Sequence, residues 1–176
     1  MANGDADITI RAAQSRDSQA IGDIYNHYVR TSIVTFEEEP VTVAEIARRI
    51  EEVQSASLPW LVAEQDSTVA GYACATPWRT RAAYRFSVEI TIYLAPGHAG
   101  RGIGSMLYSQ LLPSLQAQRI HAVVGGIALP NEASIALHEK FGFRKVAQFQ
   151  EVGFKFNRWI DVGYWQCTLK PGTSPA

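Results

Sequence analysis

Residues 88–94 carry three polar side chains at alternate positions, Glu89, Thr91 and Tyr93. Successive side chains of a β-strand point to opposite faces, so these three share one face and the apolar residues between them share the other. A carboxylate, a hydroxyl and a phenol on one surface are groups that general acid–base catalysis uses. The segment therefore predicts a strand that presents a candidate general base, Glu89; the alternative is an edge-strand glutamate in solvent.

A glycine-rich turn follows this strand after Pro96, with glycines at positions 97, 100, 102 and 104. The backbone N–H groups of such a turn can point at one anion, and a helix that begins near Gly102 adds the positive end of its dipole. Gly104 is not followed by the Lys of a Walker loop, and no downstream acidic residue in a βαβ unit completes a dinucleotide fingerprint. We interpret the turn as a pyrophosphate site at a helix N-terminus.

Other side chains could serve such a site, and each has a simpler alternative. Arg79 and Arg81 are two residues apart, so in an extended segment they can bind one oxyanion together, unless they form a solvated basic loop. Phe36 in its polar loop either holds that loop on the core or lines a pocket. Asn131 is predicted to cap a helix. His138, about two helical turns further on, either handles protons or is simply packed.

The composition describes one domain that acts on small molecules. The chain has 176 residues, of which 47% are hydrophobic, and a formal net charge of −1. No Lys/Arg cluster favours nucleic acid or an acidic membrane surface, and no apolar run approaches the roughly 20 residues that cross a bilayer. We expect a cytoplasmic protein. Cys74 and Cys167 lack partners at a metal-ligand spacing, so no metal site and no disulfide framework are predicted.

The elements that must position these residues can be placed from periodicity and capping signals. We expect a flexible N-terminus at 1–7, a single domain at 8–169 and a disordered tail at 170–176. Helices are expected near 18–28, from Thr42 to about 55, from 102 with a kink or early break at Pro113, and at 131–141. Strands are expected at 8–11, 60–64, 68–76, 88–94, 122–127, 143–151 and 160–169, with residues 153–159 joining the last two. This order predicts an α/β fold with a sheet of mixed direction and helices on both faces.

The run Ala99-Gly-Arg-Gly-Ile-Gly resembles the Gln/Arg-x-x-Gly-x-Gly/Ala turn of the GCN5-related N-acetyltransferases (GNAT), which binds the pyrophosphate of acetyl-CoA. The first position is Ala99 instead of Gln or Arg. We expect the missing side chain to weaken binding without abolishing it, because the turn acts mainly through backbone N–H groups. Further motifs are similar to the phosphinothricin and methionine sulfoximine acetyltransferase subfamily: Asn26-His-Tyr, Pro59-Trp-Leu-Val-Ala-Glu, Leu129-Pro-Asn, His138-Glu, Gly153-Phe-Lys and Trp159-Ile-Asp-Val-Gly-Tyr-Trp-Gln.

The resemblance implies a GNAT-like, mostly antiparallel sheet and direct acetyl transfer from acetyl-CoA to the α-amine of a small amino-acid analogue. It implies Glu89 as the base, with His138, Tyr93 or Tyr108 handling the other protons. The implied acetyl-CoA contacts are Leu94, Ala99, Gly100, Arg101, Gly102, Ile103, Gly104, Ser105, Asn131 and Ser134. The implied substrate contacts are Phe36, Arg79, Arg81, Tyr84, Thr91 and Val162. The subfamily also implies a homodimer, with Phe154 and Trp159 near the site, and no metal.

Two alternatives stay open from the sequence. The amine could instead be a polyamine, an aminoglycoside or a protein N-terminus, and the acidic run at 37–39 would suit a polycation. A non-catalytic acyl-CoA-binding module would keep the glycine turn without needing Glu89.

Overall fold

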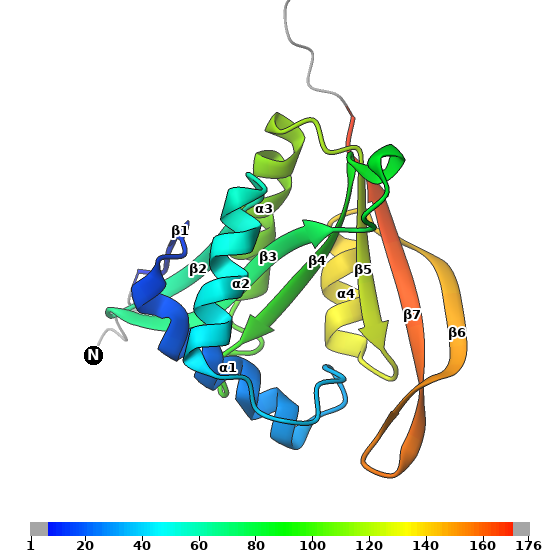
Figure 1. Ribbon diagram of the computed structural model, residues 1–176, viewed down its shortest axis with the longest axis horizontal. Coiled ribbons are helices and arrows are strands. Elements are labelled where there is room, and N and C mark those ends of the chain that lie inside the picture. Colours follow the sequence, from blue (N-terminus) through cyan, green and yellow to red (C-terminus); the bar gives the residue numbers. More distant parts are fainter. Residues whose placement is uncertain (1–6, 171–176) are drawn as a thin grey trace, which may run out of the picture.

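Seven strands form one sheet in the order β1-β2-β3-β4-β5-β7-β6 in the computed structural model, which describes residues 7–170 (Figure 1). Every neighbouring pair is antiparallel except β4 and β5, which run parallel. The predicted sheet of mixed, mostly antiparallel direction is confirmed. The strands are β1 (Thr9–Ala12), β2 (Trp60–Gln65), β3 (Thr68–Pro77), β4 (Ser87–Leu94), β5 (Ala122–Ala128), β6 (Arg144–Lys155) and β7 (Arg158–Thr168).

Four helices pack on this sheet: α1 (Ser18–Thr31), α2 (Val43–Ser55), α3 (Ile103–Ala117) and α4 (Glu132–Lys140). Two begin at the predicted caps. Thr42 Oγ1 accepts the Glu45 N–H at 3.2 Å, and Asn131 Oδ1 accepts the Ser134 N–H at 3.1 Å. Of the two outcomes expected at Pro113, a kink or an early break, the break is wrong, because α3 continues through it to Ala117. Proline removes only one intrahelical hydrogen bond, and the packed apolar face of α3 outweighs that loss.

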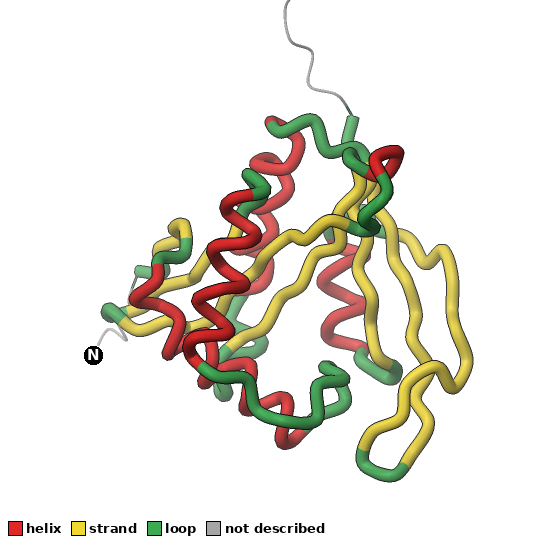
Figure 2. The backbone as a smooth tube through the Cα atoms, viewed as in Figure 1, coloured by secondary structure: helices red, strands yellow, loops and turns green. Residues whose placement is uncertain are grey.

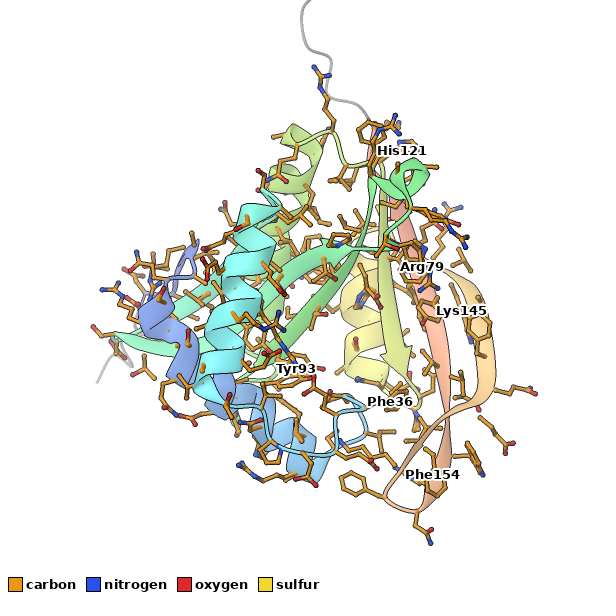
Figure 3. All side chains as sticks on the ribbon, viewed as in Figure 1. Phe36, Arg79, Tyr93, His121, Lys145 and Phe154 are labelled. Atoms are coloured by element: carbon orange, nitrogen blue, oxygen red, sulfur yellow. The ribbon has the colours of Figure 1, made fainter. Side chains whose placement is uncertain are left out.

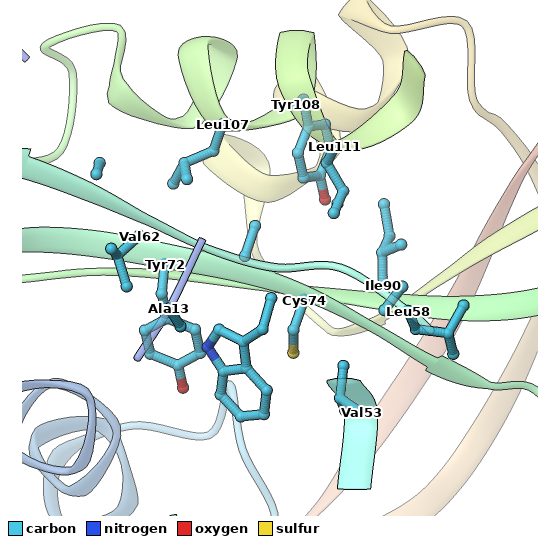
Figure 4. Packing of buried hydrophobic residues seen from close by; sticks show 14 of the residues in the cluster. Ala13, Val53, Leu58, Val62, Tyr72, Cys74, Ile90, Leu107, Tyr108 and Leu111 are labelled. Carbon is cyan, nitrogen blue, oxygen red and sulfur yellow. The ribbon is translucent and has the colours of Figure 1, made fainter. Parts of the chain in front are cut away.

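The core lies on both faces of the sheet. In Figure 4, Leu107, Tyr108 and Leu111 of α3 lie on one side of the strands, whereas Val53 of α2 lies on the other. The three α3 side chains are fully buried. Because apolar burial is the main stabilising term in folding, this two-sided packing fixes the sheet that carries β4.

Strands β4 and β5 pair only briefly. Their parallel register joins residues 87–89 to 122–124, and beyond it the two strands diverge (Figure 2). Each strand stays hydrogen-bonded on its other side, β4 to β3 as far as Leu94 and β5 to β7 as far as Ala128. The sheet therefore opens between two strands that are each hydrogen-bonded on their other side.

The β6–β7 hairpin is longer than predicted. Residues 153–159 were expected to join the two strands, but β6 continues to Lys155 and β7 begins at Arg158. The turn residues Phe156 and Asn157 both have positive φ, 51° and 57°, as a tight two-residue hairpin turn requires. Periodicity missed this extension because β6 contains a register shift near Glu151, which breaks the alternation.

Two predictions concern the ends of the chain and membranes. The flexible segment expected at 1–7 and the tail expected at 170–176 fall, but for Asp7 and Lys170, outside the residues that the structure describes. Across residues 7–170, none of the helices has the length and apolar character needed to span a membrane.

Candidate active site

Two cavities meet beside the opening between β4 and β5. The first has a volume of about 270 Å³ and is walled by β4, β5 and α4. The second, of about 320 Å³, lies between the loop after α1 and strands β6 and β7. Tyr93 of β4 and Phe36 of the loop approach this region from different elements (Figure 3). Four residues line both cavities, Val34, Glu89, Gly126 and Ala128, and Glu89 is the only ionisable one among them.

The Glu89 carboxylate is half-buried and has no hydrogen-bond donor among residues 7–170. Burial raises its pKa above the ordinary value, and the positive charge of Arg79 opposes that rise. Gly126 keeps the space around it open: a Cβ atom at that position would lie 3.0 Å from Glu89 Oε1 and 3.2 Å from Tyr164 Cε1. Glu89 can therefore accept a proton from a group that enters either cavity.

Thr91 and Tyr93 also line the first cavity, as do Ile90 and Ile92 of the same strand. The alternation shows in their packing, because Ile92 lies near Gly104 of α3 whereas Tyr93 packs against α1. The Tyr93 hydroxyl donates to the Val34 carbonyl oxygen at 3.1 Å, and burial raises its pKa. Its ring packs edge-on against Tyr25, with ring centres 5.3 Å apart. The phenol proton is therefore engaged with the backbone of the loop after α1.

His138 is buried against β5 and lines the first cavity. Its Nδ1 lies 2.8 Å from the Ser134 carbonyl oxygen, which can only accept, so Nδ1 carries the proton. The other nitrogen, Nε2, then accepts the Tyr108 hydroxyl at 3.1 Å. Burial lowers the pKa of His138, which favours the neutral ring. Tyr108 is fully buried and does not line the cavity.

The glycine-rich turn forms the entrance to α3. Gly97, Gly100 and Gly102 have φ values of 81°, 78° and 80°, in the left-handed region that favours glycine. Gly102 is the N-cap and provides no side-chain acceptor, so the first N–H groups of α3 have no capping partner. Gly104 serves another purpose, because a Cβ there would lie 3.0 Å from Leu137 Cδ2, where α3 packs on α4.

The other predicted acetyl-CoA contacts fall into two groups. Leu94, Ala99, Asn131 and Ser134 line the first cavity. Asn131 uses Oδ1 as the cap of α4, which leaves its Nδ2 without a partner in the described part of the chain. Ile103 is fully buried, Arg101 is exposed, and Ser105 Oγ accepts from Lys140 Nζ at 2.9 Å. Ile103 can therefore contribute only through its backbone.

The predicted substrate contacts are not all brought together. Phe36 and Val162 line the second cavity, whereas Thr91 lines the first. The Arg79 guanidinium lies over the Trp78 ring at 4.5 Å and acts electrostatically on Glu89. Arg81 and Tyr84 lie on an exposed 3₁₀ turn, and neither lines either cavity. Bends at residues 78, 80 and 81 interrupt the extended segment that was assumed for the two arginines, and their shared binding of one oxyanion stays a prediction.

Sequence reasoning missed three residues at the junction of the cavities, Val34, Gly126 and Tyr164. The Gly125-Gly126 pair inside a strand was an available signal, since glycine weakens a strand and often marks a close approach. A Cβ at Gly125 would collide with the His138 ring. Nothing local distinguishes Val34 or Tyr164. The described residues also include no cluster of three His, Cys, Asp or Glu side chains that could hold a metal, and both cysteines are free.

Comparisons with known proteins agree with this geometry. Residues 10–163 match the family model described as an acetyltransferase (GNAT) domain. The chain is 41% identical to the phosphinothricin N-acetyltransferase of Streptomyces coelicolor, over 94% of this chain and 99% of the relative. It is 36% identical to the L-methionine sulfoximine/L-methionine sulfone acetyltransferase of Salmonella typhimurium, over 96% and 98%. A GNAT superfamily phosphinothricin acetyltransferase from Sinorhizobium meliloti, solved in complex with acetyl-CoA, superposes with a TM-score of 0.90 at 36% identity, covering 96% of this chain and 92% of that one.

Proposed function

The chain belongs to the GNAT acetyltransferase family, and from that premise we propose that it transfers the acetyl group of acetyl-CoA to the α-amine of a small amino-acid analogue. Relatives named for phosphinothricin and for methionine sulfoximine or sulfone support this substrate class. The observation that carries the proposal is the place of Glu89. It is the one ionisable side chain among the residues that line both cavities.

The first cavity and the glycine-rich turn fit acetyl-CoA. The uncapped N–H groups at the start of α3 suit a pyrophosphate, and Ala99 connects the turn to the cavity wall. Leu94 supplies apolar surface for the pantetheine arm, while the free Nδ2 of Asn131 can donate to one of its carbonyl groups. When bound, acetyl-CoA supplies the thioester carbon that an amine attacks.

We assign the proton transfers to residues around that point. An α-amine is protonated at neutral pH and must lose one proton before it attacks, and Glu89 accepts that proton directly or through one water. The departing thiolate needs one proton. The nitrogen of the adduct gives up its second proton as the C–S bond breaks, which balances the proton that the thiolate takes. His138 and Tyr93 are proposed to pass on this proton because both line the first cavity. The Tyr93 hydroxyl must first leave the Val34 carbonyl, and the neutral His138 ring, whose Nδ1–H is held by the Ser134 carbonyl, must gain a proton before it can donate one.

The second cavity is assigned to the amine. Phe36 and Val162 form apolar walls, and Arg79, close enough to influence Glu89, is the better placed arginine for an anionic group of the substrate. Arg81 and Tyr84 would contact the substrate only from outside the two cavities. The acidic run at 37–39 does not favour a polyamine, because none of its residues lines a cavity and Glu37 pairs with Arg49 at 2.8 Å.

We further propose a homodimer that covers the outer face of the β6–β7 hairpin. Phe154 and Trp159 pack together there, with ring centres 4.9 Å apart, yet they are 50% and 62% exposed. Val152 and Phe156 of the same hairpin are also exposed, and Val152 lines the second cavity as well. Such a surface on a single chain favours contact with another protein, and a second copy fits a cyclic dimer. Sedimentation of the purified protein, with Trp159→Glu as the disrupting variant, tests this assembly.

An amine panel tests the function. We expect acetyl-CoA-dependent thiol release with methionine sulfone, methionine sulfoximine or phosphinothricin, and little with spermidine, an aminoglycoside or a peptide N-terminus. Activity on spermidine with none on the amino-acid analogues would refute the proposal. No turnover with any amine, together with tight acetyl-CoA binding, would instead favour an acyl-CoA-binding module.

A further inference from the structure

A buried lysine on the β6–β7 hairpin has no part in the chemistry above. Lys155 is 2% exposed, and its Nζ donates to the carbonyl oxygens of Ser32 at 2.9 Å and Thr35 at 2.8 Å. No carboxylate forms an ion pair with it within residues 7–170, although Glu37 and Glu38 act on its charge from a distance. Its Nζ also lies over the Phe156 ring, 5.1 Å from the ring centre. An ammonium group that gives up water for two neutral carbonyls and an aromatic ring loses solvation, so its place calls for an explanation.

Both carbonyls belong to the segment 32–36, which we call the 32–36 loop. This loop follows α1 and supplies three lining residues to the second cavity, Ile33, Val34 and Phe36. Its hydrogen bonds come from three separate elements: Lys155 of β6, the Tyr93 hydroxyl of β4 on Val34, and the Tyr25 hydroxyl of α1 on Thr35 Oγ1 at 2.7 Å. The loop is not a strand or helix, so these contacts determine where its side chains lie.

The hairpin also determines the position of the Phe36 ring. Residues 153–156 alternate, with Gly153 and Lys155 buried and Phe154 and Phe156 exposed. A Cβ atom at Gly153 would overlap the Phe36 ring, approaching its Cε1 at 2.9 Å. Phe36 therefore lies directly on the strand backbone. Gly153 and Lys155 lie two residues apart on the inner face of the strand. Gly153 contacts the Phe36 ring, and Lys155 binds the backbone of the loop that carries this ring.

We propose that Lys155 is a positioning residue for the amine substrate, which fixes the 32–36 loop so that Val34 and Phe36 give the second cavity its shape. This inference rests on the assignment of that cavity to the amine. Among the described residues, Lys155 forms no hydrogen bond with the glycine-rich turn or α4. Of the three loop residues that line the second cavity, only Val34 also lines the first, so the main influence of Lys155 falls on the amine. The two hydrogen bonds from Lys155 join residues that are more than a hundred positions apart in the sequence. Through them the β6–β7 hairpin influences substrate selectivity.

The test combines kinetics with hydrogen exchange. Lys155→Met keeps the length of the side chain and removes both hydrogen bonds. We expect the amine KM to rise about tenfold, equivalent to ~1.4 kcal/mol of lost binding, while the acetyl-CoA KM changes less than about twofold. Amide exchange at residues 33–37 should become faster. Lys145→Met is the matched control, since Lys145 is an exposed lysine of the same strand whose Nζ donates to Gln148 and lies over the Trp165 ring, with no hydrogen bond to the 32–36 loop among the described residues. It should change none of these values.

Several outcomes would overturn the proposal. An unchanged amine KM, an equal rise in both KM values, or unchanged exchange at 33–37 would each show that Lys155 does not position the amine site. If the wild-type protein acetylates no amine, the proposed function fails, and the exchange experiment alone decides whether Lys155 fixes the loop. If Lys155→Met does not fold, Gly153→Ala displaces Phe36 with the lysine in place, and an unchanged amine KM in that variant would contradict the inference.

Discussion

Replacing Glu89 by Gln removes the proposed base with almost no change in shape. General-base catalysis contributes typically about 10²–10⁴ in rate, which corresponds to roughly 2.7–5.4 kcal/mol at 1.36 kcal/mol per factor of ten. We therefore expect kcat to fall by about two to four orders of magnitude. Because Glu89 accepts no hydrogen bond in the described part of the chain, the amide breaks no existing hydrogen bond, and only the attraction to Arg79 is lost.

Stability gives an internal control for this variant. Burial raises the pKa of Glu89, so its protonated form favours the folded state, and that contribution is lost as pH rises through the folded-state pKa. At neutral pH the ionised carboxylate therefore destabilises the fold, and Glu89→Gln should melt at the same temperature as the wild type or higher. A loss of turnover then reports on chemistry and not on unfolding.

The assay is thiol release with the best amine of the panel, followed as a function of pH. In the wild type, kcat/KM for the amine should decline as pH falls through the pKa of Glu89, in addition to the decline from protonation of the amine itself. In the variant, the decline due to Glu89 should be absent. The affinity for acetyl-CoA, measured by calorimetry, should stay within about twofold of the wild-type value. Unchanged turnover in Glu89→Gln would refute the assignment of the base, and lost acetyl-CoA binding would refute the division of the two cavities.

Three further predictions follow from the same geometry. Gly102→Ala places a side chain at φ 80°, which costs roughly 1–2 kcal/mol. The acetyl-CoA KM should rise while the amine KM stays unchanged. The reverse pattern would contradict the role of the turn in binding acetyl-CoA. Arg79→Met should raise the amine KM about tenfold in steady-state kinetics. Arg81→Met should raise it less, and equal effects of the two variants would show that the exposed turn moves over the site. Burial lowers the pKa of His138, so stability from its neutral ring is present above pH 6.5 and is lost as pH falls through the folded-state pKa. In urea unfolding, the free energy of unfolding of His138→Gln should decline less toward acidic pH than that of the wild type. An identical decline would show that another group is responsible for the pH dependence.

Local chemistry was enough to predict much of the fold. Thr42 and Asn131 predicted the starts of two helices, because each side chain accepts a hydrogen bond from an N–H group only three residues away. The alternation of residues 88–94 predicted the face that Glu89 shares with Tyr93, because the period of a strand is a local property. The break expected at Pro113 failed because local sequence does not show tertiary packing. The packing that outweighs one missing hydrogen bond involves residues distant in the sequence.

The site needed tertiary structure because its walls come from segments far apart in the chain. By itself, the sequence determined a strand with a candidate base, a turn with uncapped amides and the order of elements around them. Only the fold decided that β4 and β5 separate after residue 89, that Gly126 and Tyr164 lie by Glu89, and that the charge of Arg79 acts on Glu89. Periodicity and capping act over a few residues, whereas strand divergence and the meeting of two cavities depend on how every strand pairs with its neighbours.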